Sequence, residues 1–368
     1  MIKIFDYKKS LKEIYPEISK AIEKILFSGQ LILGTETESF EKEFCEFVGA
    51  KYCIGVNSGT AALYISLMAL GIGEGDEIIT VSNTCVPTIS AIETVGAKPV
   101  FVDINEHDMM INTELIEKAI TTRTKAIIPV HLWGQSVDID SIMDIAKRNN
   151  LKVLEDCAQA VGTIHKGNHV GNFGDLAAFS FYPTKNLGAY GDAGMIVTNN
   201  HKLAEKAGLM RMYGYDKNHI SIVKGTNARI SEIQSAILRV KLRYLPEWLR
   251  KRRKNADYYL ENIKNKKIKL PYIYKNREHS FHQFVIRVKE RAVLIKKLKK
   301  KEIQYGIHYP VPVHQMHYYK RKYKVSLPIT EQVVTDILSI PVHENLKREE
   351  LKQIIDLLNK ISKRRKNV

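Results

Sequence analysis

The chain has 368 residues, of which 44% are hydrophobic and 26% charged, as expected for a globular protein with one large and one smaller domain. Its net charge of +17 is uneven, because residues 241–368 hold 33 basic and 12 acidic residues, whereas residues 1–240 hold 24 and 28. The absence of a long apolar run, a signal peptide and a C-x-x-C pair argues against a membrane protein, a secreted protein and a zinc protein, and favours the cytoplasm.

The first predicted element is an amphipathic helix that begins with a capping box at Ser10, ends near Phe27 and is stopped by Gly29. From there to residue 200, short apolar runs alternate with helical patterns. The runs lie at 51–56, 77–81, 99–102, 126–130 and 152–154, and the helical patterns at 60–70, 87–95, 113–120 and 140–149. Strands separated by such helices predict crossover units and a mostly parallel sheet that is buried on both faces.

The pattern changes after residue 200. Two further apolar strands, at 176–181 and 195–198, enclose a glycine-rich loop, and a long basic helix follows at 230–263, which Pro246 is expected to kink or break. Beyond it, the sequence predicts a strand and two helices, at 282–288, 291–301 and 349–362. We therefore predict a large α/β domain over residues 1–250 and a smaller α+β domain over residues 251–368.

Small and charged residues follow three of the predicted strands, and open parallel sheets bind ligands at this end of their strands. Residues 57–62 (NSGTAA) open a helix, where free N–H groups and the helix dipole favour an anion. Asp156 ends an apolar strand, where a carboxylate needs a cationic partner. Lys185 follows the strand at 176–181 and precedes a glycine-rich loop.

Taken singly, these features have ordinary explanations: a helix cap, a buried salt bridge and a surface lysine. Together they are the three anchors of a pyridoxal phosphate cofactor. The helix start suits its phosphate, Asp156 suits its protonated ring nitrogen, and the Lys185 amine suits a Schiff base with its aldehyde.

The chain resembles the DegT/DnrJ/StrS sugar aminotransferases, a branch of the fold-type I pyridoxal-phosphate enzymes, over nearly its whole length. The segments that carry the resemblance are 55–63, 71–79, 129–135, 155–160, 306–310 and, most specifically, 179–188 (FSFYPTKNLG). The resemblance implies an α/β fold in which helices enclose a mixed, mostly parallel seven-stranded sheet.

The resemblance also implies roles for residues around the cofactor. Lys185 would form the Schiff base and then move the proton between the substrate carbon and the cofactor, while Asp156 pairs with the ring nitrogen. The remaining cofactor contacts would come from Gly59, Thr60 and Ser180 at the phosphate, Gln159 near the ring hydroxyl, and Asn227. Cys85 stands where many relatives have an aromatic residue, and it is expected to lie against the ring with a smaller contact area.

Substrate and assembly follow from the same resemblance. Asn227 and Arg229 match a loop that reaches the other subunit's site, so a homodimer with active sites at the subunit interface is expected. Tyr182, Arg229, His308 and Tyr309 are expected to bind the substrate. The expected reaction moves the amino group of L-glutamate to carbon 3 of a dTDP-linked 3-keto-6-deoxyhexose. The close alternative is carbon 4 of a UDP- or GDP-linked 4-keto sugar. Either product is a deoxyamino sugar of the kind used in O-antigen or S-layer glycans.

The basic last third of the chain leaves other functions open. Nucleic acid, an anionic membrane surface and a phosphorylated small substrate would each suit its basic runs, which lie at 250–254, 296–301, 320–324 and 363–366. A non-catalytic nucleic-acid-binding protein is one alternative, but no recognition motif accompanies the charge. A sugar dehydratase is another, but related dehydratases lack the lysine. We expect neither nucleic acid, nor membrane, nor metal as a partner, and interpret most of the charge as a solvated surface.

Overall fold

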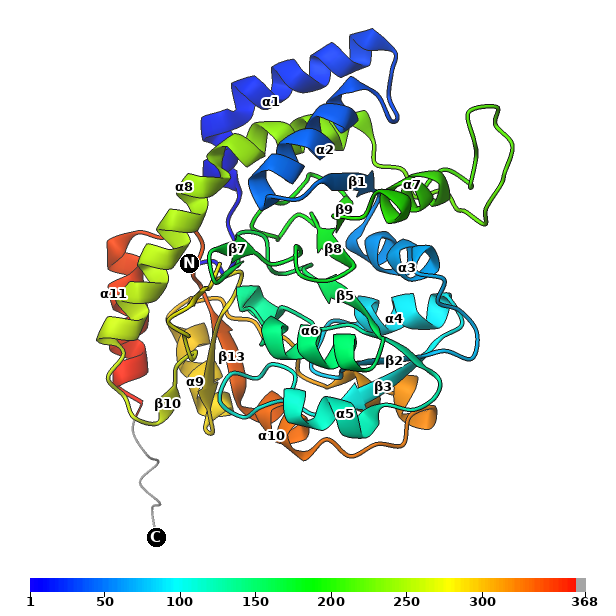
Figure 1. Ribbon diagram of the computed structural model, residues 1–368. Helices are drawn as coiled ribbons and strands as arrows, with labels where there is room; N and C mark the ends of the chain where they lie inside the picture. Colours follow the sequence, from blue (N-terminus) through cyan, green and yellow to red (C-terminus); the bar gives the residue numbers. More distant parts are fainter. Residues whose placement is uncertain (362–368) are drawn as a thin grey trace.

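The computed structural model describes residues 1–361 and places a seven-stranded sheet at the centre of the molecule (Figure 1). The order across the sheet is β1-β9-β8-β5-β4-β2-β3. The strands are β1 (Tyr52–Val56), β2 (Glu77–Val81), β3 (Lys98–Val102), β4 (Thr124–Ile127), β5 (Lys152–Asp156), β8 (Leu176–Ser180) and β9 (Gly194–Thr198). Strand β9 runs antiparallel to both neighbours, whereas the other pairs are parallel, which confirms the predicted mixed sheet.

Helices cover both faces of this sheet because its strands are apolar on both sides. On one face lie α3 (Gly59–Ala69), α4 (Val86–Thr94) and α7 (His201–Met210). On the other lie α2 (Thr35–Val48), α6 (Ile139–Arg148) and the first half of α8 (Glu232–Asn262). Helices α2 and α7 were not anticipated from the sequence.

The N-terminal helix α1 (Lys8–Ser28) packs on α8, and its end at Gly29, with φ 72°, agrees with the sequence. Its predicted start is wrong. Tyr7 occupies the N-cap position and makes no side-chain cap, while Ser10 lies inside the helix and donates a hydrogen bond to Glu344 at 3.3 Å. The serine hydroxyl is therefore used to fasten the helix to a distant part of the chain.

Helix α8 continues through Pro246, so of the predicted kink or break, the break is wrong. A proline inside a helix costs about 3 kcal/mol, and burial of its neighbours offsets that cost. Leu245 and Leu249 are buried beneath the large sheet, and Trp248 packs against α1. The C-terminal half of α8 instead packs into the core of the last third of the chain, so the boundary proposed at residue 250 falls inside one continuous helix.

The last third forms a three-stranded antiparallel sheet, in the order β10 (Ile268–Lys269), β12 (Phe284–Val288) and β13 (Ile337–Ile340). Helices α9 (Arg291–Lys300) and α11 (Arg348–Asn359) share a core with it. Strand β13 and helix α10 (Pro328–Asp336) were not anticipated. Ser362 and the basic run at 363–366 lie outside the described residues.

The remaining elements are short. They are α5 (Ile116–Ala119), β6 (Ile164–His165), β7 (Asn168–His169), β11 (Arg277–Glu278) and the 3-10 turns Thr113–Leu115, Leu132–Gly134, Val313–Gln315 and Tyr319–Arg321. Within residues 1–361, none of the helices combines the length and the apolar character that crossing a bilayer requires.

Candidate active site

A cavity of about 330 Å³ lies at the carboxyl ends of β5 and β8. This is the edge at which open parallel sheets bind ligands, and the volume falls in the range of ligand pockets. Ten of the residues predicted from the sequence line it: Gly59, Thr60, Cys85, Asp156, Gln159, Ser180, Tyr182, Lys185, His308 and Tyr309. The fold thus brings together side chains that are up to 250 positions apart in the sequence.

The start of α3 forms one wall of the pocket. Ser58 is the N-cap, and its hydroxyl accepts the N–H of Ala61 at 3.0 Å. A Cβ atom on Gly59 would lie 2.6 Å from the Cβ of Ser180, so only glycine allows the helix start to approach that strand end. The first N–H groups of a helix have no partner within the helix, which makes this wall suitable for a phosphate.

Asp156 lies opposite, at the end of β5, with 4% of its surface exposed. Thr88 donates its hydroxyl hydrogen to Oδ2 at 2.8 Å, and the N–H of Ala158 donates to Oδ1 at 3.1 Å. Burial raises the pKa of Asp156, whereas these two donors and the charge of Lys185 lower it. Both groups that donate directly to Asp156 are neutral, so its negative charge can still be balanced by a cationic group of a ligand.

A second buried carboxylate, Glu155, supports the strand end from behind. It accepts hydrogen bonds from three backbone N–H groups in residues 171–174 and lies 3.0 Å from Nε2 of His131. The pKa of Glu155 is lowered because His131 and these N–H groups outweigh its burial. Cys157 completes a group whose possible metal-ligand atoms lie within 4.8 Å of one another. Because Glu155 already accepts four hydrogen bonds, we interpret the group as structural support.

Lys185 lies in the loop between β8 and β9. Burial lowers the pKa of its amine, against the opposing effects of Cys85 and Asp156, and this favours the neutral form that attacks a carbonyl. The loop is anchored from α8, where the buried Lys241 donates a hydrogen bond to the carbonyl of Gly188 and lies 4.4 Å from the ring centroid of Tyr190.

These groups fit pyridoxal phosphate by chemistry and by position. The helix start can hold the phosphate, and the buried Asp156 carboxylate lacks only a cation, which the protonated ring nitrogen would supply. The partly buried Lys185 amine shares the same cavity and is available for the aldehyde.

The far wall of the pocket comes from the last third of the chain. Gln159 donates to the hydroxyl of Tyr309 at 2.9 Å, and burial raises the pKa of that hydroxyl. His308 shares a hydrogen bond of 2.8 Å with Ser339, and burial together with the charge of Lys185 lowers the pKa of its imidazole. The thiol of Cys85 lies near the Tyr309 hydroxyl, and this cysteine is only half-buried, unlike the other three.

Asn227 and Arg229 do not line this pocket within the described part of the chain. They lie at the base of the loop between α7 and α8, where Arg229 forms a backbone bridge with Val56 of β1 and Asn227 one with Met212. The middle of this loop extends away from the body of the protein in Figure 1. Asn227 is exposed, and its side-chain oxygen accepts a hydrogen bond from Arg229 at 3.0 Å.

Sequence reasoning missed several residues that line the pocket: Thr84, Thr88, Asp192, His282 and Gln283. Thr88 follows Cys85 by three positions at the start of a helix, so helical spacing could have placed both on one face. His282 had no comparable signal. It lies just before β12, is 8% exposed, and has a pKa lowered by burial and by Lys185.

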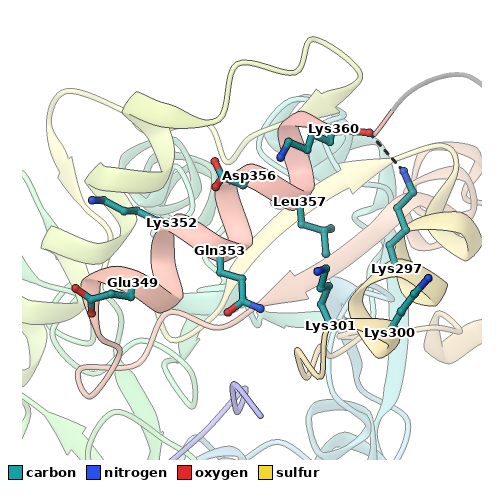
Figure 2. Close-up of a pocket in the computed structure, with 9 residues that line it drawn as sticks. All are labelled: Lys297, Lys300, Lys301, Glu349, Lys352, Gln353, Asp356, Leu357 and Lys360. Atoms are coloured by element: carbon teal, nitrogen blue, oxygen red, sulfur yellow. Dashed lines mark hydrogen bonds between the residues drawn. The ribbon is translucent and has the colours of Figure 1, made fainter.

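A larger groove, of about 640 Å³, lies between α9 and α11 and shares no residue with this pocket (Figure 2). Five lysines line it, together with the acidic residues Glu349 and Asp356: Lys297, Lys300, Lys301, Lys352 and Lys360. These five lysines of the basic last third therefore lie outside the cavity that contains Lys185.

Comparison with known proteins extends these observations. The sequence profile of the DegT/DnrJ/EryC1/StrS aminotransferase family matches residues 12–359. A dTDP-3-amino-3,6-dideoxy-alpha-D-galactopyranose transaminase of Aneurinibacillus thermoaerophilus is 46% identical over 360 residues, which cover 98% of this chain and 99% of that protein. A dTDP-3-amino-3,4,6-trideoxy-alpha-D-glucose transaminase of Micromonospora megalomicea subsp. nigra is 40% identical, with 94% of each chain covered. The crystal structure of S. venezuelae DesV in complex with a ketimine intermediate superposes with a TM-score of 0.95 at 38% identity over 97% of each chain.

Proposed function

Because this chain belongs to the DegT/DnrJ/EryC1/StrS aminotransferase family, whose cofactor is pyridoxal phosphate, we propose that it transfers the amino group of L-glutamate to carbon 3 of a dTDP-linked 3-keto-6-deoxyhexose. The observation that carries the proposal is a single pocket lined by Lys185, Asp156, the start of α3 and residues 308–309. Carbon 3 is favoured over carbon 4 of a UDP- or GDP-linked sugar because both relatives named above are transaminases of dTDP-3-amino sugars.

Two residues carry the chemistry in this proposal. When bound, pyridoxal phosphate supplies an electrophilic aldehyde carbon and a ring that withdraws electrons. The Lys185 amine, whose pKa is lowered by burial, takes a proton from the carbon of the amino donor in the first half-reaction. In the second half-reaction, which runs in reverse, it delivers a proton to the sugar carbon that receives the amino group. Asp156 stays ionised with the help of Thr88 and Ala158, and so keeps a proton on the ring nitrogen.

The other lining residues bind and orient. Gly59, Thr60 and Ser180 hold the phosphate at the start of α3, and Cys85 packs against the ring. On the opposite side, Tyr182, His308 and Tyr309 contact the sugar nucleotide, with Gln159 between the two groups. These neutral hydrogen-bonding side chains suit a hydroxylated substrate.

A homodimer completes the site. Asn227 and Arg229 lie outside their own pocket, at the base of a loop that extends from the body of the protein (Figure 1). Two apolar side chains of that loop, Ile220 and Ile222, are 59% and 58% exposed, which is costly unless a second subunit covers them. Asn227 then contacts the partner's cofactor and Arg229 the partner's substrate.

We place the enzyme in the cytoplasm. All four cysteines are free, and the thiol of Cys45 lies close enough to Cys53 to contribute, after burial, to the raised pKa of the Cys53 thiol. Neighbouring thiols that remain reduced suit a reducing compartment. Nucleotide-linked sugars that feed O-antigen or S-layer glycans would be its products there.

The direct experiment follows the visible absorbance of the bound cofactor while L-glutamate and then the dTDP-linked 3-keto sugar are added. We expect the band to fade as 2-oxoglutarate appears and to return as the amino sugar forms. A preference for a 4-keto sugar would overturn the assignment of carbon 3. A band that does not respond to glutamate would overturn the donor.

Substitution of the lysine is the control for this assay. Lys185→Ala removes both the covalent anchor and the proton carrier, so turnover is expected to fall by at least the roughly 10²–10⁴-fold typical of a lost general base. Turnover near the wild-type rate would contradict the role of Lys185, whichever sugar is used.

Complementation tests the dimer. Lys185→Ala and Arg229→Ala chains are each expected to be nearly inactive alone. If Arg229 acts on the partner's pocket, mixing and reassociating the two chains restores activity, because one site of each mixed dimer has both residues intact. No recovery in mixed dimers purified through different affinity tags on the two chains would show that Arg229 does not act on the partner's pocket.

A further inference from the structure

We propose that Trp133 is a positioning residue that holds the segment His308–Tyr309 against Gln159 and thereby sets the affinity for the nucleotide-linked substrate. This inference rests on the proposed function for the identity of that substrate. Trp133 does not line the pocket, so its action would be indirect, through the residues to which it is hydrogen-bonded.

Three hydrogen bonds connect Trp133 to three different parts of the site. Its backbone N–H donates to Oε1 of Gln159 at 2.9 Å, and its indole Nε1–H donates to the carbonyl of His308 at 2.9 Å. Its carbonyl accepts the N–H of Gln283 at 3.1 Å. The side chain is only 3% exposed, so these bonds form where water does not compete.

The first two bonds belong to a closed ring. Gln159 also donates from Nε2 to the hydroxyl of Tyr309 at 2.9 Å, and Tyr309 is covalently joined to His308. The ring therefore passes from Trp133 to Gln159, to Tyr309, to His308 and back to the indole. It links the turn after β4 and the segment after β5 to the last third of the chain, which supplies the substrate side of the pocket.

The backbone of this region is held in an uncommon conformation. Trp133 has φ 59° and ψ 6°, the left-handed region that bulky residues rarely adopt, and Gly134 follows with φ 97°. The facing turn repeats the pattern at Phe281, with φ 47°, and the N–H of Ser280 donates to the carbonyl of Gly134 at 2.9 Å. Such conformations persist only where the surroundings enforce them, and they concentrate at functional sites.

A simple packing role would not need the indole nitrogen. Trp133 shares an apolar cluster with Leu132 and Val137, and a phenyl ring could occupy most of that space. The N–H directed at the carbonyl of His308 is specific to tryptophan. Replacing Trp133 by phenylalanine therefore separates the hydrogen bond from the packing.

The test compares Trp133→Phe with Trp248→Phe in the full-length holoenzyme. Trp248 is the chain's other tryptophan; it is 6% exposed, lies on α8 and packs against α1. In Trp133→Phe, loss of the bond leaves the partly buried carbonyl of His308 without this donor, so KM for the nucleotide-linked sugar is expected to rise about tenfold, equivalent to about 1.4 kcal/mol. The rate of the glutamate half-reaction of Trp133→Phe, followed by cofactor absorbance, should stay within about twofold of wild type. Trp248→Phe should change neither this rate nor KM for the sugar.

The outcomes separate this inference from the proposed function. If wild type uses the sugar but Trp133→Phe has the KM of Trp248→Phe, or slows both half-reactions equally, Trp133 has no positioning role. If wild type does not use the sugar, the acceptor assignment fails. In that case, calorimetric dissociation constants for dTDP and UDP test Trp133 without turnover, and about tenfold weaker binding by Trp133→Phe would still support it.

A measurement on the unsubstituted protein covers the case in which Trp133→Phe does not fold. Labelling tryptophan with ¹⁵N gives two indole N–H signals, because the chain has two tryptophans, and Trp248→Phe assigns them. Adding dTDP should shift the Trp133 signal and leave the Trp248 signal in place. A shift in neither signal, in both equally, or in Trp248 alone would overturn the proposal.

Discussion

Thr88 donates a hydrogen bond to Asp156 Oδ2 at 2.8 Å, in a pocket where burial raises the pKa of that carboxyl. Removing the donor with Thr88→Val should raise the pKa further. Asp156 then becomes protonated at a higher pH and no longer holds a proton on the ring nitrogen. A hydrogen bond to a charged group contributes about 1.5–3 kcal/mol, so the acidic limb of the kcat profile should move up by about one to two pH units.

Thr88→Ser is the matched control for this prediction, because it keeps the hydroxyl and loses only a methyl group. It should leave the acidic limb near that of wild type. If Thr88→Val and Thr88→Ser give the same pH profile, the hydroxyl does not control the ionisation of Asp156.

Individual site residues differ in how well the sequence predicts them. Asp156 ends β5, and Lys185 lies in the loop that follows β8. Because the ends of parallel strands meet at one edge of a sheet, topology alone places the two near each other. His282 and Trp133 contribute through turns with left-handed backbone at Phe281 and Trp133. No local propensity predicts such conformations, because contacts with distant parts of the chain enforce them.

Helix α8 is connected to the loop that carries Lys185 by the buried Lys241, which donates to the carbonyl of Gly188. Burial lowers the pKa of Lys241 to about 8, although the Gly188 carbonyl and the Tyr190 ring stabilise its charge. In Lys241→Met the loop loses this anchor, and a displaced catalytic amine should lower kcat by roughly ten- to hundredfold. Single-turnover absorbance with glutamate measures the effect.

The same residue predicts a pH dependence of stability. Below about pH 8 Lys241 is protonated in both states, and the folded protein carries the full cost of the buried charge. Between about pH 8 and pH 10.5 the folded state has lost the proton that the unfolded chain still binds, so that cost disappears. Wild type should therefore gain up to about 3 kcal/mol relative to Lys241→Met over this interval.

Urea unfolding near pH 7.5 and near pH 10 measures that gain. Lys251→Met, on an exposed part of the same helix, is the control and should follow wild type at both values. An unfolding free energy of Lys241→Met that runs parallel to wild type across the interval would contradict a lowered pKa for Lys241.

Elements with a clear hydrophobic period were predicted well, whereas those defined by distant contacts were not. The parallel strands and their crossover helices follow from apolar runs of the right length. Helix α2 was missed although it begins with Thr35. Its start depends on the buried Glu232, whose carboxylate accepts hydrogen bonds from the backbone N–H groups of residues 34, 36 and 37. Helix α8 passes Pro246 because its neighbours are buried, which is a property of the tertiary structure.

For the whole molecule, the uneven charge predicts how salt affects the reaction. The basic last third attracts an anionic nucleotide sugar. Salt screens this attraction, because the Debye length falls as salt is added and is about 10 Å at 0.1 M. Raising NaCl from about 0.02 M to about 0.5 M should lower kcat/KM for the sugar by a factor on the order of three to ten. If kcat/KM for the sugar does not change with salt, the basic last third does not steer the substrate electrostatically.

The groove in Figure 2 provides a control for the source of that field. Lys300→Glu with Lys301→Glu reverses two charges that line the groove but lie outside the active-site pocket. If steering comes from charges near the pocket, this double variant keeps the salt dependence of wild type. A flattened dependence would show that the distant lysines contribute.

Helix α8 packs with its first half in the core of the large sheet and with its second half in the core of the last third, so it marks a division of the enzyme along the sequence. The residues proposed to hold the cofactor within one subunit precede this helix, whereas His282, His308 and Tyr309 follow it. Of the residues proposed to bind the sugar, only Tyr182 and Arg229 precede α8. A chimera that takes its last third from a relative would therefore exchange the sugar contacts of His308 and Tyr309, keep those of Tyr182 and Arg229, and retain its own response to glutamate.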